Sequence, residues 1–150
     1  MSEQTRHRPR AHFPTPEDAE AAFYDAIERG DLEALMAVWC EDEEIVCIHP
    51  GGPRLVGLAA VRSAWQAIFD GPRFRLRIAQ RARWQSGLMA VHNVVEVPTL
   101  ADDPNAQEPV FATNVFVRGA DGWRLVAHHA GLGPDTDDAP GATDAPRVLH

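Results

Sequence analysis

The sequence predicts one α+β domain, with three N-terminal helices packed on an antiparallel sheet. Apolar residues recur at helical spacing three times before residue 70, and after residue 73 they alternate with polar residues as in half-buried strands. The chain has 150 residues, of which 45% are hydrophobic. That is enough for one domain to bury a core without disulfides or metal ions.

The first helix is expected to begin after Thr15, which can cap it, with Pro16 at its first position, and to end at Gly30. Its apolar face comprises Ala19, Ala22, Phe23, Ala26 and Ile27, while Glu20, Asp25 and Glu28 fall elsewhere. Asp31 caps a second helix that is apolar on more than one side. Leu58, Val61, Trp65, Ile68 and Phe69 define a third helix, which Gly71 and Pro72 stop.

The strands follow a change of period. Residues 45–48 form a short strand that ends at a Pro-Gly-Gly-Pro turn, with His49 at its mouth. Further strands are expected over residues 73–78, 88–97, 110–118 and 123–130, the last two joined by a hairpin turn. Residues 98–109 contain three prolines and are expected to be a loop.

The domain boundaries are set by composition. Residues 14–133 form the domain, residues 1–13 a flexible arm and residues 134–150 a tail rich in Pro, Asp, Gly, Ala and Thr. No run of about eighteen apolar residues is present, so we expect a soluble, cytoplasmic protein that does not enter a membrane.

Charge and residue usage exclude several functions. The net charge of −8 argues against nucleic acid as a partner, because nucleic-acid binding needs a basic surface. All 14 basic residues are Arg, so lysine Schiff-base chemistry is excluded. Cys40 and Cys47 match neither a zinc pair nor a redox motif, and we expect buried reduced thiols. Arg73, Arg75, Arg77, Arg81 and Arg83 form a basic stripe. It could bind an anionic partner, but solvated strand residues are the favoured interpretation.

The order of elements resembles the cone-shaped α+β superfamily of nuclear transport factor two, the ketosteroid isomerases and the SnoaL-like cyclases. The resemblance covers residues 14–133 and is carried by Ala-Phe-Tyr-Asp-Ala at 22–26, Gly-Asp-Leu at 30–32, Cys-Ile-His-Pro-Gly at 47–51 and Asp-Gly-Trp-Arg-Leu-Val at 121–126. It implies a strongly bent sheet folded around one cavity. None of these motifs is specific for an activity, because this fold hosts enzymes and binding modules alike.

The resemblance also implies site residues. His49 occupies the place of the isomerases' general base, Asn114 that of their second acid, and Phe23 that of their phenol. Both carboxyls and the phenol are therefore missing, and steroid isomerisation by that mechanism is not expected. Parity along the strands puts His129 on the same face as Asn114, with His128 on the other, and the resemblance puts His92 inward with Glu96.

The predicted site thus has His49, His92, Asn114 and His129 as catalytic residues, with Phe23, Trp39, Trp65, Glu96 and Phe116 contacting the substrate. Histidine can transfer protons at neutral pH, which suits a small lyase or isomerase-like enzyme without a cofactor, acting on an apolar carbonyl or hydroxyl compound. His49 is the preferred general base. The alternative is a non-catalytic module that binds a small ligand or a protein.

Two further expectations concern metals and partners. A zinc site made by His49, His92 and His129 is the less favoured alternative, because the three residues come from separate elements without a local ligand motif. Apolar residues on both faces of the sheet, such as Val115 and Phe116, predict a homodimer that forms through the sheet. The related superfamily's habit of pairing through its sheets points the same way.

Overall fold

The computed structural model describes residues 10–100 and 102–133. These residues form three helices and a seven-stranded sheet. The elements are α1 (Pro16–Arg29), α2 (Leu32–Val38), β1 (Val46–Ile48), β2 (Arg54–Val56), α3 (Leu58–Phe69), β3 (Phe74–Gln85), β4 (Met89–Leu100), β5 (Asp103–Ala106), β6 (Val110–Gly119) and β7 (Gly122–Leu132). The predicted α+β class with three N-terminal helices is confirmed.

The helix ends lie where the sequence placed them. The Thr15 side chain accepts a hydrogen bond from the backbone N–H of Asp18, and Asp31 does the same for Ala34 at the start of α2. Gly30 ends α1 with a φ of 64°, a left-handed conformation that favours glycine. Both ends of α1 and the start of α2 are therefore fixed by contacts with residues next to them in the sequence.

The sheet is mixed rather than purely antiparallel. Its order is β2-β1-β7-β6-β4-β3, with β5 paired to β4 outside this path. The long strands β3, β4, β6 and β7 pair antiparallel, whereas β1 pairs parallel with β7. The strand β2 was not expected, because three residues are too few for a visible alternation; the turn after β1 returns the chain so that Val56 pairs with Val46.

The prediction of a loop over residues 98–109 is wrong in part. β4 continues to Leu100, and β5 then folds back so that Ala106 pairs with Thr99. Pro98 does not stop β4, and it pairs with Leu76 of β3.

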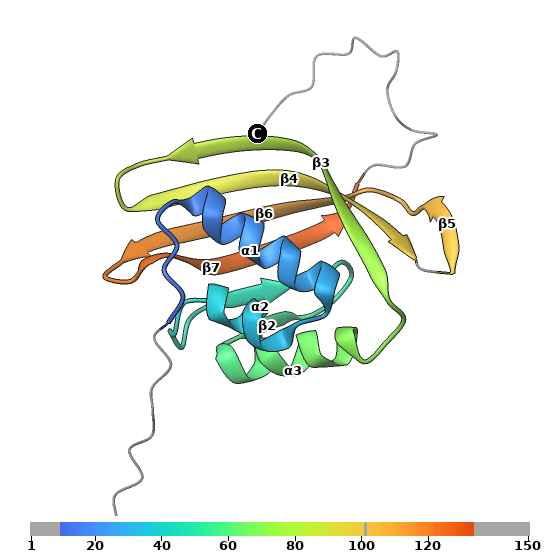
Figure 1. Cartoon of the computed structure of the whole chain (residues 1–150), viewed down its shortest axis with the longest axis horizontal. Helices are drawn as coiled ribbons and strands as arrows, with labels where there is room; N and C mark the ends of the chain where they lie inside the picture. Colours follow the sequence, from blue (N-terminus) through green and yellow to red (C-terminus); the bar gives the residue numbers. More distant parts are fainter. Residues whose placement is uncertain (1–9, 101, 134–150) are drawn as a thin grey trace, which may run out of the picture.

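The basic stripe is divided by an irregularity in β3. The register against β4 shifts between Ile78 and Gln80, and the part of β3 before this shift runs down toward α3 (Figure 1). Past the bulge, Arg81 and Arg83 lie 3.4 and 3.6 Å from carboxylates of Glu20 and Glu17 on α1. All five arginines of the stripe are exposed, as the favoured interpretation of solvated strand residues predicts, and Arg81 and Arg83 in addition join β3 to α1.

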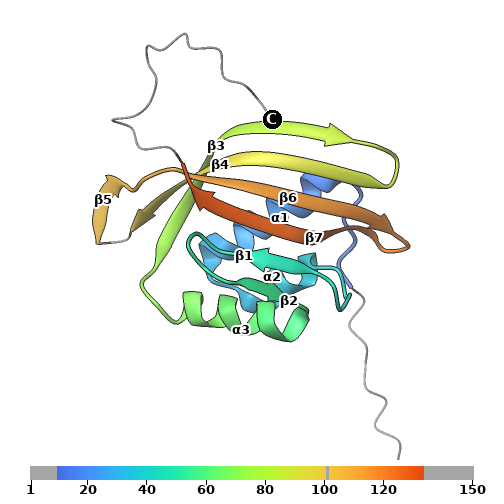
Figure 2. The same ribbon diagram turned by 180° about the vertical axis from the view of Figure 1, so that it is seen from behind.

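The helices cover one face of the sheet and leave the other open, as the two opposite views show (Figures 1 and 2). The core lies between them and includes Phe23, Leu35, Trp39 and Phe116, none of which is exposed. On the open face Trp84, Met89 and Phe111 are 58%, 39% and 39% exposed. The helices and the inner face of the sheet thus enclose the core of the described residues.

The chain before α1 is held against the start of β7. Phe13 pairs with Gly122 and accepts a hydrogen bond from the backbone N–H of Trp123 at 2.9 Å, and the Arg124 guanidinium lies 4.9 Å from the centre of its ring. The end of the predicted arm is therefore part of the domain. Residues 1–9 of that arm and the predicted tail at 134–150 lie outside the described residues. Within the described part, no helix combines the length and apolar character needed to cross a bilayer.

Candidate functional site

A cavity of about 180 Å³ opens between β1, α3 and the inner face of the sheet. Three ionisable side chains line it: His49, Glu96 and His128. The rest of its wall is mostly apolar and includes Trp65, Ile68, Phe74, Leu76, Val110 and Ala130. This combination of an apolar wall with a few converging polar groups is typical of a small-molecule site.

Glu96 is the carboxyl group of this cavity, and it is only 5% exposed. Burial raises the pKa of Glu96 to about 7, because the charged form loses hydration; the hydrogen bond from Tyr24 lowers the pKa and the charge of Glu20 raises it, each with a smaller effect. Tyr24 Oη donates to Glu96 Oε2 at 2.7 Å. Glu96 can therefore both release and accept a proton near neutral pH.

A buried chain of hydrogen bonds continues from Tyr24 through Asn114. The Asn114 Nδ2 group donates to Tyr24 Oη at 3.0 Å and lies 3.5 Å from Glu20 Oε2. Its Oδ1 lies 2.5 Å from Nδ1 of His128. Asn114 is therefore inward, as predicted, but its amide is already occupied by protein groups and does not line the cavity.

His128 is 2% exposed, and its ring packs on that of Phe23 at an angle of 58°, with ring centres 5.1 Å apart. Burial lowers the pKa of His128 to about 3, with smaller effects from His49 and His129, so the ring is neutral at pH 7. The ring centre of His49 lies 6.4 Å from that of His128 and 4.7 Å from that of Trp65. Burial also lowers the pKa of His49. The cavity thus holds two neutral imidazoles and one carboxyl at pH 7.

His92 and Glu20 form a second buried pair behind the cavity. His92 Nδ1 lies 2.8 Å from Glu20 Oε2, and both residues are nearly inaccessible. The prediction that His92 points inward with Glu96 is confirmed, but His92 does not line the cavity. Glu20 was placed off the apolar face of α1, yet it is 4% exposed, because Arg81 and His92 provide partners for a carboxylate inside the domain.

The predicted orientation of His129 is wrong. His129 is exposed and its neighbour His128 is buried, the reverse of the parity argument. The cause is a bulge: Val115 pairs with Ala127 and Phe116 with Leu125, so Val126 is an extra residue in β7. One extra residue moves every later side chain of the strand to the opposite face.

Three of the nine predicted site residues line the cavity, namely His49, Trp65 and Glu96. Phe23, Trp39 and Phe116 are core residues that support it from behind. The residues that sequence reasoning missed are His128 and Tyr24. Tyr24 was detectable, because it follows Glu20 by one helical turn and both polar groups then share a face of α1.

The three histidines proposed as an alternative zinc site are not brought together. His49 lines the cavity, His92 pairs with Glu20, and His129 is on the open face of the sheet. Within the described ranges, no group of three or more His, Cys, Asp or Glu side chains is placed to hold a metal ion.

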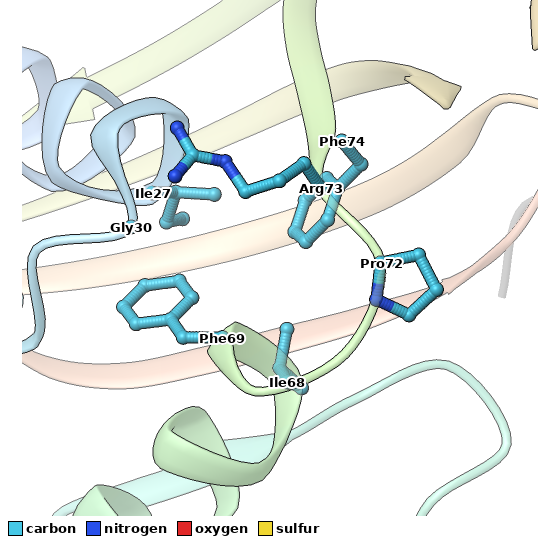
Figure 3. A pocket seen from close by; sticks show the side chains of 7 residues that line it. All are labelled: Ile27, Gly30, Ile68, Phe69, Pro72, Arg73 and Phe74. Atoms are coloured by element: carbon cyan, nitrogen blue, oxygen red, sulfur yellow. The ribbon is translucent and has the colours of Figure 1, made fainter. Parts of the chain in front are cut away.

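A second, smaller hollow of about 40 Å³ adjoins the cavity, since Ile68 and Phe74 line both spaces. Arg73 lies across it above Ile27, at the C-terminal end of α1 (Figure 3). Cys47 is the central residue of β1 and is buried, and desolvation raises the pKa of its thiol to about 12. Cys40 is half-buried, not buried as expected. Neither thiol lines either space.

Comparison with known proteins places the chain in a family. Residues 17–132 match the SnoaL-like domain. A "putative calcium/calmodulin-dependent protein kinase type II association domain" from Thiobacillus denitrificans is 41% identical, with a TM-score of 0.79 over 84% of this chain and 99% of that one. A "putative dehydratase from the NTF2-like family" of Streptomyces avermitilis is 30% identical, with a TM-score of 0.70 over 78% of this chain and 92% of that one.

A further solved structure shares the fold alone. It is an NTF2-like protein of unknown function from Pseudomonas putida, 17% identical, with a TM-score of 0.71 over 81% of this chain and 86% of that one. No curated protein matches the chain. Because the family match spans most of the domain, the chain belongs to the SnoaL-like family and has the NTF2-like fold.

Proposed function

We propose that the protein is a small cofactor-independent enzyme of the lyase or isomerase type, which transfers protons on an apolar carbonyl or hydroxyl compound held in the cavity. The observation that carries this proposal is Glu96, a carboxyl group with a pKa of about 7 in a mostly apolar cavity. Titratable groups tuned to neutral pH by burial are typical of active sites. The Streptomyces relative named as a dehydratase supports the same chemistry.

In the dehydration direction, the Glu96 carboxylate removes the proton from the carbon next to the substrate carbonyl. A carbon–carbon double bond forms as the C–O bond to the neighbouring carbon breaks, and the new Glu96 carboxylic acid returns the proton to the leaving hydroxide. Water is released and the carboxylate is regenerated. Isomerisation uses the same removal of a proton, followed by its return at another carbon of the substrate.

The hydrogen bond from Tyr24 favours this role, because a phenol that already donates to Glu96 keeps the carboxyl in one rotamer. His49, which the sequence favoured as general base, lies in the cavity wall beside Pro50. It is neutral at pH 7 and can assist as a hydrogen-bond partner of the substrate. We assign the general base to Glu96 because its pKa, unlike that of His49, is raised toward neutral pH.

The size of the cavity limits the substrate. A dry cavity of about 150 Å³ accommodates benzene. The cavity described above, at about 180 Å³, therefore suits one ring or a short chain of about seven to nine non-hydrogen atoms. Cyclohexanone and 3-hydroxycyclohexanone are suitable probes, because both have this size and carry the required carbonyl.

The test measures exchange of the protons next to the carbonyl of cyclohexanone in D₂O by NMR. We expect the wild type to accelerate exchange, Glu96→Gln to abolish the acceleration, and Glu43→Gln, which alters an exposed carboxyl, to retain it. Acceleration that survives in Glu96→Gln but is lost in His49→Gln would return the base role to His49. Exchange that is no faster with the wild type than with Glu96→Gln, under conditions where the ketone binds, would overturn the proposal in favour of a binding module.

A second candidate function is an assembly module that performs no chemistry. The observation that favours it is the open sheet face, where Trp84, Met89 and Phe111 expose apolar surface. The Thiobacillus relative, named as an association domain, points the same way. We propose that this face pairs with a second copy of the chain. The two functions are separable, because the cavity and the open face lie on opposite sides of the sheet.

A further inference from the structure

The buried amide of Asn114 determines which nitrogen of His128 is available to a ligand. We propose that Asn114 is a positioning residue that holds His128 in the Nδ1–H tautomer, so that its open Nε2 selects compounds bearing a hydroxyl group near their carbonyl. The specificity part of this inference rests on the proposed function, which supplies the carbonyl as the group acted on by Glu96. The tautomer part does not.

The orientation of the Asn114 amide follows from its neighbours. Nδ2 lies 3.0 Å from Tyr24 Oη and 3.5 Å from Glu20 Oε2. Tyr24 has committed its own proton to Glu96, and a carboxylate can only accept, so both positions require a donor. The amide oxygen must then face the remaining neighbour, His128.

That oxygen fixes the proton of His128. Asn114 Oδ1 lies 2.5 Å from His128 Nδ1, and a carbonyl oxygen can only accept a hydrogen bond. Nδ1 must therefore carry the proton. Because the pKa of His128 is lowered to about 3, the ring is neutral at pH 7 and carries only this one N–H proton. Its Nε2 is therefore unprotonated and can accept a hydrogen bond.

Nε2 of His128 is open to the cavity. His128 Nε2 has no hydrogen-bond partner among the described residues. Four of their side-chain atoms lack a partner and are also fully buried, and His128 Nε2 is not one of them: Trp39 Nε1, Trp65 Nε1, His92 Nε2 and Arg124 Nε. It therefore keeps contact with the space that His128 lines. Oε1 of Glu96 is also open to this space, because Tyr24 donates to Oε2 and Oε1 is not among the fully buried atoms without a partner.

The cavity thus offers one fixed acceptor, His128 Nε2, and one carboxyl, that of Glu96, which gains and loses a proton. A ketone alone leaves His128 Nε2 without a partner in an apolar space, whereas a hydroxyl group on the same molecule donates to it. A neutral hydrogen bond of this kind changes affinity by about threefold to tenfold. We therefore expect 3-hydroxycyclohexanone to bind about threefold to tenfold more tightly than cyclohexanone.

The tautomer is tested directly by ¹⁵N NMR of the histidine side chains at pH 7. The wild type should show His128 as a neutral ring protonated at Nδ1. Asn114→Leu should shift the ring toward the Nε2–H form, while Asn93→Leu, which removes an exposed amide on the same sheet, should leave it unchanged. A wild-type His128 that is protonated at Nε2, or doubly protonated, overturns the inference even if Asn114→Leu fails to fold.

The specificity is tested by titrating both probes into the wild type and into Asn114→Leu. We expect the preference for the hydroxyl compound to disappear in the variant, while the affinity for cyclohexanone changes little. Equal binding of the two probes by the wild type overturns the specificity part. This result is distinct from failure of the proposed function, which is decided by whether proton exchange depends on Glu96.

Discussion

Replacing Glu96 by glutamine should stabilise the protein at alkaline pH and change it little in acid. Glutamine matches the carboxyl in size, and its oxygen can still accept the hydrogen bond from Tyr24. The substitution therefore removes the buried charge while keeping the packing. The difference in stability between the wild type and Glu96→Gln then reports the protonation of Glu96.

The magnitude follows from the two pKa values. In the folded chain the pKa of Glu96 is about 7, against an ordinary value of 4.5 when unfolded. As the pH rises past 4.5 the unfolded chain releases this proton while the folded chain keeps it, so folding becomes less favourable until the pH passes 7. At about 1.4 kcal/mol per pH unit, the wild type loses about 3 kcal/mol across this window and the variant loses none of it.

The assay is urea unfolding of the wild type, Glu96→Gln and the exposed control Glu43→Gln at pH 5 and pH 8. We expect the advantage of Glu96→Gln over the wild type to grow by about 2 to 3 kcal/mol between the two pH values, and the control to follow the wild type. An advantage that is the same at both pH values would show that Glu96 titrates normally, and the assignment of the general base would lose its support.

Three further outcomes follow from other parts of the fold. Gly122→Ala should destabilise the domain by about 2 kcal/mol or more in urea unfolding. Gly122 has a φ of 92°, and a Cβ there would lie 2.4 Å from Phe13 O. Gly131→Ala has free space and should be nearly neutral, so equal effects of the two substitutions would contradict the described contact with Phe13. Light scattering should give about twice the chain mass of 16.5 kDa at micromolar concentration, and Phe111→Arg on the open face should reduce it to one chain; a wild-type mass of 16.5 kDa would end the dimer proposal. A thiol reagent at pH 8 should modify Cys40 first and leave Cys47 unmodified in the folded protein, since burial raises the pKa of Cys47 to about 12; modification of Cys47 at a comparable rate would contradict its burial.

The helices could be predicted from sequence because their signals are local. Thr15, Gly30 and Asp31 act on the backbone within a few residues of themselves, so caps and ends follow from the adjacent sequence alone. The helix ends needed no knowledge of the rest of the chain. Along β4 the family resemblance supplied the inward face of His92 and Glu96, and the prediction was right because the alternation is not interrupted where β4 pairs with β6.

The missed parts of the site depend on pairing between distant residues. Val126 is an ordinary strand residue by type, and only its place opposite β6 makes it the extra residue of a bulge. The burial of Glu20 likewise depends on Arg81, which reaches it only because the register of β3 shifts beyond Ile78. A single sequence carries no signal for either shift, so alternation counted across them assigns the wrong face.

The bulge at Val126 predicts how the stability of the domain depends on pH. It allows Leu125 and His128, three positions apart, to face the core together, which an even alternation forbids. Burial lowers the pKa of His128 to about 3, whereas the pKa of an unfolded histidine is about 6.5. As the pH falls below 6.5, His128 therefore takes up a proton in the unfolded chain but not in the folded chain. Between pH 7 and pH 5 this lowers the stability by about 2 kcal/mol. Measured as the difference from the wild type in urea unfolding, the stability of His128→Gln should rise by about 2 kcal/mol from pH 7 to pH 5, and that of His129→Gln, its exposed neighbour, should not change. If the rise is seen with His129→Gln instead, the strand has no bulge and His129 is the histidine of the interior.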